Sequence, residues 1–159
     1  MSTAPNFAAL PWRMKHQDVI NACKASIKWL GGQWIDLYQI HFPNSWSNTE
    51  YWDGLADVYD AALVCTVSMS NYGSEALCAT HAALSKQGIK LMMNQIQLLL
   101  LYRWLIENGI MDTCKELDVQ VLSYSPLALI GFLMRKYSKD NLPLGPRKEL
   151  VKPLFESKE

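Results

Sequence analysis

The stretch Ile35-Asp36-Leu37-Tyr38-Gln39-Ile40-His41 decides the fold, because a short apolar run ends there in a polar side chain. Three later runs repeat this pattern: they begin at Leu63, Lys90 and Val119, and end near Ser70 and Asn71, Gln95, and Tyr124 respectively. Successive runs start 28, 27 and 29 residues apart. That spacing leaves room for a crossover helix between each pair of parallel strands. The sequence therefore predicts an α/β fold of consecutive strand–helix units.

The segments between the runs have helical periodicity. Leu77, His81 and Leu84 share one helical face, and Ile106, Ile110, Cys114 and Leu117 share another. Gly88 suits a helix C-terminus, whereas Gly109 falls inside the last expected helix and weakens it by about 1 kcal/mol relative to Ala. The apolar piece from Phe7 to Leu10 is expected to end a preceding strand.

Composition indicates one compact, cytosol-type domain, with 159 residues of which 50% are hydrophobic. The 15 basic and 15 acidic residues balance, and no Lys/Arg-rich run occurs. We therefore expect no nucleic-acid partner and no membrane partner. The longest apolar run, around residues 98–101, is too short to span a bilayer, and the first residues do not resemble a signal sequence.

The four cysteines are widely separated at positions 23, 65, 78 and 114, without a CxxC pair or a histidine at metal-ligand spacing. We expect reduced thiols, mostly on buried faces, and no metal site.

The polar run ends are candidates for a functional site. In parallel sheets the carboxyl ends of the strands meet at one edge, where the following loops form a crevice. Each residue also has a structural interpretation: His41 as a strand cap, residues 70–73 as a turn that caps the next helix, and Asn94 and Gln95 as partners for backbone groups. Their repetition on successive strands favours a shared site.

These motifs resemble the aldo-keto reductase family. The matching stretches are DLYQIHFP (36–43), Ser70-Asn71, Gln95 in MMNQI (92–96) and Tyr124 in SYSPLA (123–128). Within the family, FAALPWR (7–13), YWDGLAD (51–57), SNYG (70–73), LYR (101–103) and GPR (145–147) are most similar to a plant plastid branch. The resemblance runs from Phe7 to Pro146 and implies a partial (β/α)8 TIM barrel of four to five parallel β/α units. We divide the chain into a reductase-like domain at 1–137 and an irregular polar tail at 138–159.

The resemblance implies NADPH-dependent reduction of an aldehyde or ketone, with pyridoxal as an expected substrate. It assigns His41 to the substrate carbonyl and Tyr124 to stacking on the nicotinamide. Ser70, Asn71 and Gln95 would bind the carboxamide, and the loop residues Ser125 and Leu127 would also bind NADP. A chloroplast location is implied, although no transit peptide is recognised in this chain, with the cytoplasm as the alternative.

Departures from the family pattern predict little or no turnover by this chain. A (β/α)8 barrel has about 250 residues, and the family's catalytic Asp and Tyr lie on the first strands, before the matched region. Asn6 stands where the family has Lys, and Ala62 and Ser68 replace glycines. Bulky residues occupy the loop that would approach the cofactor pyrophosphate: Leu129, Ile130, Phe132 and Met134.

Three readings of the function follow. The first is a family oxidoreductase whose barrel is completed elsewhere, and the second is a non-enzymatic degenerate paralogue or truncated gene product that binds a partner. The third is an unrelated flavodoxin-like domain, but no run is followed by a Gly-rich phosphate loop. Open sheet edges would allow self-association.

Trp29 and Trp104 are expected to pack within helices, and Trp12 and Trp46 to lie in loops near the site.

Overall fold

Five parallel strands form one sheet in the computed structural model, which describes residues 3–10, 12–13, 15–44, 48–98 and 108–124 and the positions 138, 140–142, 144 and 148. The elements follow in the order β1 (Asn6–Phe7), α1 (His16–Leu30), β2 (Ile35–Ile40), α2 (Thr49–Asp60), β3 (Val64–Ser70), α3 (Ser74–Lys86), β4 (Leu91–Gln97), α5 (Ile110–Glu116) and β5 (Gln120–Tyr124). The four predicted runs are therefore confirmed as strands, each within one residue of its expected start.

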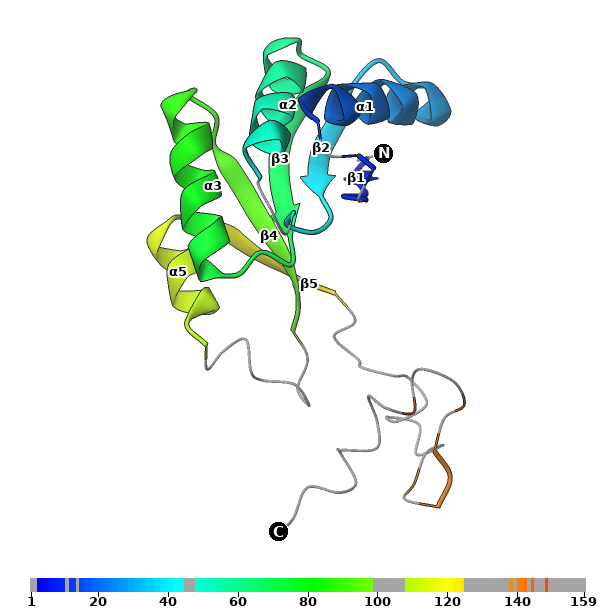
Figure 1. Cartoon of the computed structure of the whole chain (residues 1–159), viewed down its shortest axis with the longest axis vertical. Helices are drawn as coiled ribbons and strands as arrows, with labels where there is room; N and C mark the ends of the chain where they lie inside the picture. The colour runs from blue at the N-terminus through cyan, green and yellow to red at the C-terminus, as the bar shows by residue number, and fades with distance from the viewer. Residues whose placement is uncertain are drawn as a thin grey trace.

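The strand order in the sheet is the order along the chain, β1-β2-β3-β4-β5, with every pair parallel. Right-handed crossovers between neighbouring parallel strands place all connecting helices on the same face. Figure 1 shows α1, α2, α3 and α5 together on one side of a curved sheet. This is the arrangement of consecutive units in a (β/α)8 barrel, as the sequence predicted.

The hydrophobic core lies between the sheet and these helices. Strand side chains such as Ile40, Val67 and Met69 are fully buried and pack with helix side chains such as Leu55 and Leu77. Tyr38 belongs to the same layer, because its hydroxyl donates to the carbonyl of Val19 on α1 at 3.4 Å. Tyr38 therefore points toward the helices.

Gly54 allows α1 and α2 to pack closely. A Cβ atom at this position would lie 2.7 Å from the Cβ of Val19 and 2.8 Å from the carbonyl oxygen of His16. The same helix pair is joined at its beginning by His16, whose backbone N–H donates to the Glu50 carboxylate at 3.0 Å. The close packing of α1 against α2 therefore requires a glycine at position 54.

Two glycines end up in different roles. Gly88 has φ +74 and follows the last turn of α3, as expected for a helix C-terminus. Gly109 has φ +80 and immediately precedes α5, so the prediction that it lies inside that helix is wrong. Ile110 and Cys114 are buried on the expected face, whereas Ile106 lies outside the described residues.

Surface exposure corrects two further predictions. Trp29 is 90% exposed and does not pack within the fold, while Trp104 lies outside the described residues. Cys23 and Cys114 are buried, but Cys65 and Cys78 are exposed, and all four are free thiols. None of the described helices is long and apolar enough to cross a membrane.

The predicted division at residue 137 lies outside the described part of the chain. Within the predicted tail, Ser138 and Asn141 form an isolated antiparallel bridge through two hydrogen bonds of 3.1 Å.

Candidate functional site

Strand register places three of the predicted site residues, His41, Ser70 and Gln95, in one row. Ser70 is the register partner of Gln95, and Gln95 is the partner of Leu122. Ile40 pairs with Met69, so the next residue, His41, stands level with Ser70. Neighbouring residues in a parallel register project to the same face of a sheet. His41, Ser70 and Gln95 therefore share the face opposite Tyr38 and the helices.

Asn71 joins three strand ends through its side chain. Its Nδ2 donates to the carbonyl oxygen of His41 at 3.0 Å and to Ser70 Oγ at 3.0 Å, and its Oδ1 accepts from the Tyr124 hydroxyl at 2.9 Å. The backbone N–H of Asn71 also donates to the carbonyl of Gln95 at 2.8 Å. Asn71 thus binds the ends of β2, β3 and β5 through its side chain and the interior of β4 through its backbone N–H.

This arrangement requires an uncommon backbone conformation. Asn71 has φ +61, in the left-handed region that Asn tolerates better than most residues with a side chain. The conformation turns the side chain back across the strand ends instead of toward α3. The alternative that residues 70–73 form a turn that caps α3 is confirmed in part, because the N-cap residue of α3 is Gly73, although no side chain of the turn caps the helix.

Ser70 is the last residue of β3 and is 1% exposed. Its hydroxyl donates to the carbonyl of Gln95 at 3.1 Å, so β3 and β4 are linked by a side chain as well as by the ladder. Gln95 lies within β4 and not at its end, because the strand continues to Gln97. The half-buried Gln95 side chain nevertheless stands in the row with Ser70.

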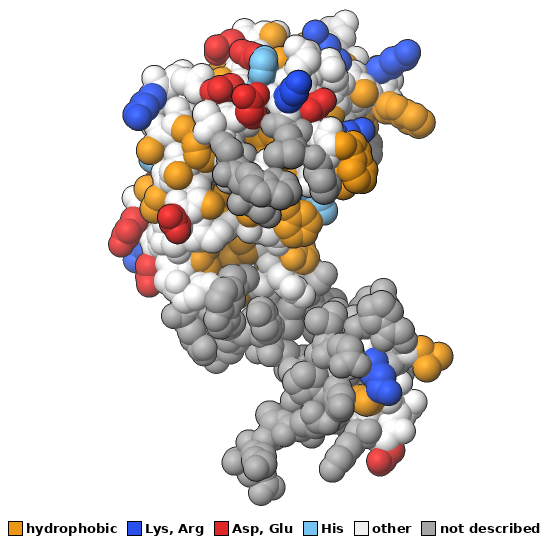
Figure 2. Space-filling view, in the orientation of Figure 1, with side chains coloured by type: hydrophobic (Ala, Val, Ile, Leu, Met, Phe, Trp, Pro, Cys, Tyr) orange, Lys and Arg blue, Asp and Glu red, His pale blue; other side chains and the backbone are white. Residues whose placement is uncertain are grey.

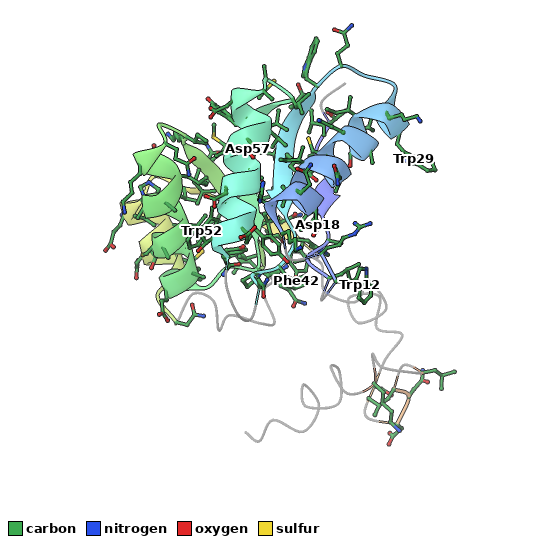
Figure 3. All side chains as sticks on the ribbon, turned by 45° about the horizontal axis from the view of Figure 1, so that its top comes forward. Trp12, Asp18, Trp29, Phe42, Trp52 and Asp57 are labelled. Atoms are coloured by element: carbon green, nitrogen blue, oxygen red, sulfur yellow. The ribbon has the colours of Figure 1, made fainter. Side chains whose placement is uncertain are left out.

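His41 follows β2 directly and is only partly buried. Its backbone N–H donates to the carbonyl of Phe7 at 3.0 Å, and its ring lies 4.4 Å from the Phe42 ring at an interplanar angle of 50°. Phe42 is 48% exposed. Figure 3 places Phe42 and Trp12 on the same side of the molecule, so aromatic side chains from two loops lie near the open end of this row.

Asn94 supports the site from the helix side of the sheet. Fully buried, it donates from Nδ2 to the carbonyl of Tyr72 at 2.8 Å and accepts from the N–H of Tyr72 at 3.4 Å. The structural interpretation considered for this residue, a partner for backbone groups, is confirmed. Asn94 fixes the loop that carries Asn71.

The next row toward the amino ends of the strands is also polar. Asn6 pairs with Gln39, Gln39 with Ser68, and Ser68 with Met93. Gln39 donates to the carbonyl of Met69 at 3.1 Å, whereas Ser68 Oγ is buried with no hydrogen-bond partner. Asn6, the first residue of this row, is exposed and uncharged.

Burial makes three tyrosine hydroxyl groups weaker acids than free tyrosine. It raises the pKa of Tyr124 and, more strongly, the pKa of Tyr38 and Tyr72. Each hydroxyl already donates a hydrogen bond: Tyr124 to Asn71, Tyr38 to Val19 and Tyr72 to Asn48. None of the cationic side chains in the described ranges is hydrogen-bonded to these phenols.

The site can therefore hold an uncharged polar group more readily than it can transfer a proton. Both N–H groups of the Asn71 amide are used internally, which leaves an acceptor position on Oδ1 and the Gln95 amide for a ligand. Ser125 and Leu127 lie outside the described residues. Within the ranges that the structure describes, no group of His, Cys, Asp and Glu could hold a metal ion.

Comparison with known sequences gives one family. A model of the Aldo/keto reductase family matches residues 8–153. "Pyridoxal reductase, chloroplastic" of Arabidopsis thaliana is 38% identical over 160 aligned positions, which cover 96% of this chain and 42% of that protein. "NADPH-dependent alpha-keto amide reductase" of Saccharomyces cerevisiae is 30% identical over 140 aligned positions, which cover 82% of this chain and 41% of that protein. The chain thus spans less than half the length of these curated relatives.

Solved structures of the same kind share the fold. An aldo/keto reductase from Klebsiella pneumoniae in complex with NADP and acetate has a TM-score of 0.70 at 20% identity, covering 82% of this chain and 44% of that one. Bombyx mori aldo-keto reductase in complex with NADP has a TM-score of 0.66 at 23% identity, covering 94% of this chain and 48% of that one. The five described strands correspond to part of a larger barrel.

Proposed function

This chain belongs to the aldo/keto reductase family, and we propose that its row of strand-end side chains is the nicotinamide-facing side of a site for NADPH-dependent reduction of an aldehyde or ketone. The observation that supports this most is the Asn71 amide, which joins Ser70, Tyr124 and the end of β2 at one point. The three similar spacings between the runs would not by themselves require such a meeting point. NADP is the cofactor found with structural neighbours of the family.

The residues present fit a carboxamide. Asn71 Oδ1 can accept from its amide group, and the half-buried Gln95 side chain can donate to its oxygen. Ser70 fixes Asn71 in place, and the ring of Tyr124 offers a flat face held by its own hydroxyl. Ser125 and Leu127 would continue the contact along the cofactor. Bound NADPH would supply the hydride, and His41 would orient the oxygen of the carbonyl substrate.

The proton that must reach the carbonyl oxygen has no suitable donor among the described residues. The Tyr124 phenol is a weaker acid than free tyrosine because of burial, and it already donates to Asn71. Losing a general acid costs about a hundredfold to ten-thousandfold in rate. We therefore propose that this chain by itself turns over little substrate, and that further β/α units are needed for the full activity.

The names of the relatives also suggest a substrate and a cellular location to test for this chain. The Arabidopsis thaliana relative is named a chloroplastic pyridoxal reductase, and we propose pyridoxal as the first substrate to test and the plastid as the first compartment to examine. Residues 1–137 would form the reductase-like domain and residues 138–159 a separate tail.

A second candidate is a non-enzymatic role in which the chain binds a partner. The exposed, uncharged Asn6 favours this role, because it cannot lower the pKa of a proton donor as a cation would. Without a cation near the strand ends among the residues that the structure describes, the site would keep its shape but lack a proton relay.

The deciding experiment is a titration with NADPH followed by tryptophan emission. We expect saturable quenching for the unaltered chain and an affinity at least about tenfold lower for Asn71→Asp, which loses two hydrogen-bond donors. Asn21→Asp on the exposed face of α1 is the matched control and should bind normally. Absence of saturable binding by the folded chain would support the non-enzymatic role, and rapid pyridoxal reduction would contradict the proposed lack of a proton donor.

A further inference from the structure

Large apolar side chains are exposed at the end of α1. Trp29 is 90% exposed, Trp34 53% and Leu30 50%. Figure 3 shows Trp29 projecting from the end of α1, away from Phe42 and Trp12 beside the strand-end row. We call Lys24, Lys28, Trp29, Leu30 and Trp34 the tryptophan tip.

A tight turn produces this surface. Gly31, with φ +66, ends α1 and donates its N–H to the carbonyl of Ile27 and that of Lys28. The chain then passes through Gly32 and Gln33 to β2. Trp29 and Trp34 therefore stand on the two arms of one exposed turn.

The charged side chains on the last two turns of α1 have one sign. Lys24 and Lys28 are one helical turn apart on the exposed face of α1, and neither forms an ion pair with a described residue. No acidic residue occurs between Asp18 and Asp36. Beyond the turn, the Asp36 carboxylate accepts hydrogen bonds from the backbone N–H of Thr3 at 2.8 Å, from the Thr3 hydroxyl at 3.3 Å and from the Trp34 side chain, which together lower the Asp36 pKa. Figure 2 shows hydrophobic and basic side chains side by side over α1.

We propose that the tryptophan tip docks on an anionic membrane surface. Tryptophan favours the level of the lipid headgroups, where its ring is partly apolar and its N–H is hydrated, and lysine is attracted to anionic lipids. The zero net charge of the chain, from which we expected no membrane partner, does not describe this local surface. Because the tip lies at the amino ends of the strands, docking leaves the strand-end row open to solvent. This inference does not depend on the proposed function.

The test is flotation of the full chain with vesicles. We expect binding to phosphatidylcholine vesicles that contain about a third phosphatidylglycerol, and much weaker binding to phosphatidylcholine alone. Trp29→Ser should reduce the partition coefficient about tenfold, because the apolar ring no longer enters the interface. Lys24→Gln with Lys28→Gln should remove the preference for the anionic lipid, as should about 1 M salt.

Trp12→Ser is the matched control, since Trp12 is 74% exposed but lies near the strand-end row. It should bind the anionic vesicles as the unaltered chain does. Circular dichroism would confirm that each variant is folded, which is expected because the replaced side chains are exposed. Binding that Trp29→Ser leaves unchanged, or no flotation of the unaltered chain, would overturn the proposal and leave a protein partner as the occupant.

Discussion

The Tyr124 hydroxyl donates a hydrogen bond of 2.9 Å to Asn71 Oδ1, 53 residues earlier in the chain. This bond connects the last described strand to the middle of the sheet. It also orients the Asn71 amide so that both of its N–H groups point to His41 and Ser70.

Removing this hydroxyl should loosen the site while keeping the aromatic ring. Tyr124→Phe is expected to lower the free energy of unfolding by about 1 kcal/mol, the typical net value of one hydrogen bond. Urea denaturation followed by circular dichroism would measure it. Tyr59→Phe on the exposed surface of α2 is the control and should change little. Equal losses in the two variants would mean that the Tyr124–Asn71 bond contributes nothing specific.

The two serines of β3 should respond in opposite directions. Ser68 Oγ is buried without a partner, so Ser68→Ala is expected to stabilise the chain by about 1 kcal/mol. Ser70 Oγ donates to Gln95 and accepts from Asn71, so Ser70→Ala should destabilise it by about 1–2 kcal/mol. Denaturant unfolding would give both changes in the free energy of unfolding from the shift of the midpoint, provided that the dependence on denaturant concentration is the same in each variant. A destabilising Ser68→Ala would show that its hydroxyl has a partner in solution.

A methyl group should not fit between α1 and α2. Gly54→Ala would place its Cβ 2.7 Å from Val19 Cβ, and we expect a loss of about 1–3 kcal/mol as the helices move apart. Gly73→Ala is the matched change, since a Cβ there meets nothing within 4 Å. It should cost less than about 1 kcal/mol as a poorer helix N-cap. Thermal unfolding of the two variants tests this difference, and a tolerated Gly54→Ala would mean that the helix contact is loose.

The link between Asp36 and Thr3 should depend on pH. Hydrogen bonds from Thr3 lower the Asp36 pKa in the folded chain, so the carboxylate adds stability above its unfolded pKa of about 4. That contribution is lost as the pH falls through the lowered folded pKa. Asp36→Ala should therefore be less stable than the unaltered chain at neutral pH and similar to it near about pH 2. A difference that persists unchanged in acid would exclude this origin.

Only two of the four thiols should react in the folded chain. Burial raises the pKa of the Cys23 thiol to about 11, with a smaller opposing effect of Lys24, and burial also raises the pKa of Cys114. Cys65 and Cys78 are exposed. Labelling with iodoacetamide at neutral pH should modify these two, and all four after denaturation. Mass spectrometry of the peptides identifies the sites, and rapid labelling of Cys23 would show that α1 separates readily from the sheet.

The strands and the site row were predictable because both depend on local pattern. Apolar runs at steady spacing identify parallel strands, and parallel strands bring polar ends such as Ser70 and Tyr124 to one edge. The bond between Asn71 and Tyr124 was not predictable, since it depends on the registers of two strand pairs, β3–β4 and β4–β5, and on the positive φ of Asn71.

Helix ends were the weaker part of the prediction. Apolar periodicity indicates which face of a helix is buried, but it does not reveal where the helix leaves the body of the protein. For that reason Trp29 was expected to pack and is instead 90% exposed. Gly109 was placed inside a helix because the periodic pattern extended back to Ile106, although its φ of +80 suits the residue before the helix.

The sequential strand order has a consequence for how the chain acquires its structure. Each strand pairs with the one that preceded it, so no described strand waits for a distant segment before it can add to the sheet. Each pairing closes a loop of about one β/α unit, so the entropic cost of closing the loop stays similar from one strand to the next. During synthesis the sheet can thus grow one β/α unit at a time from the amino terminus, in step with the ribosome.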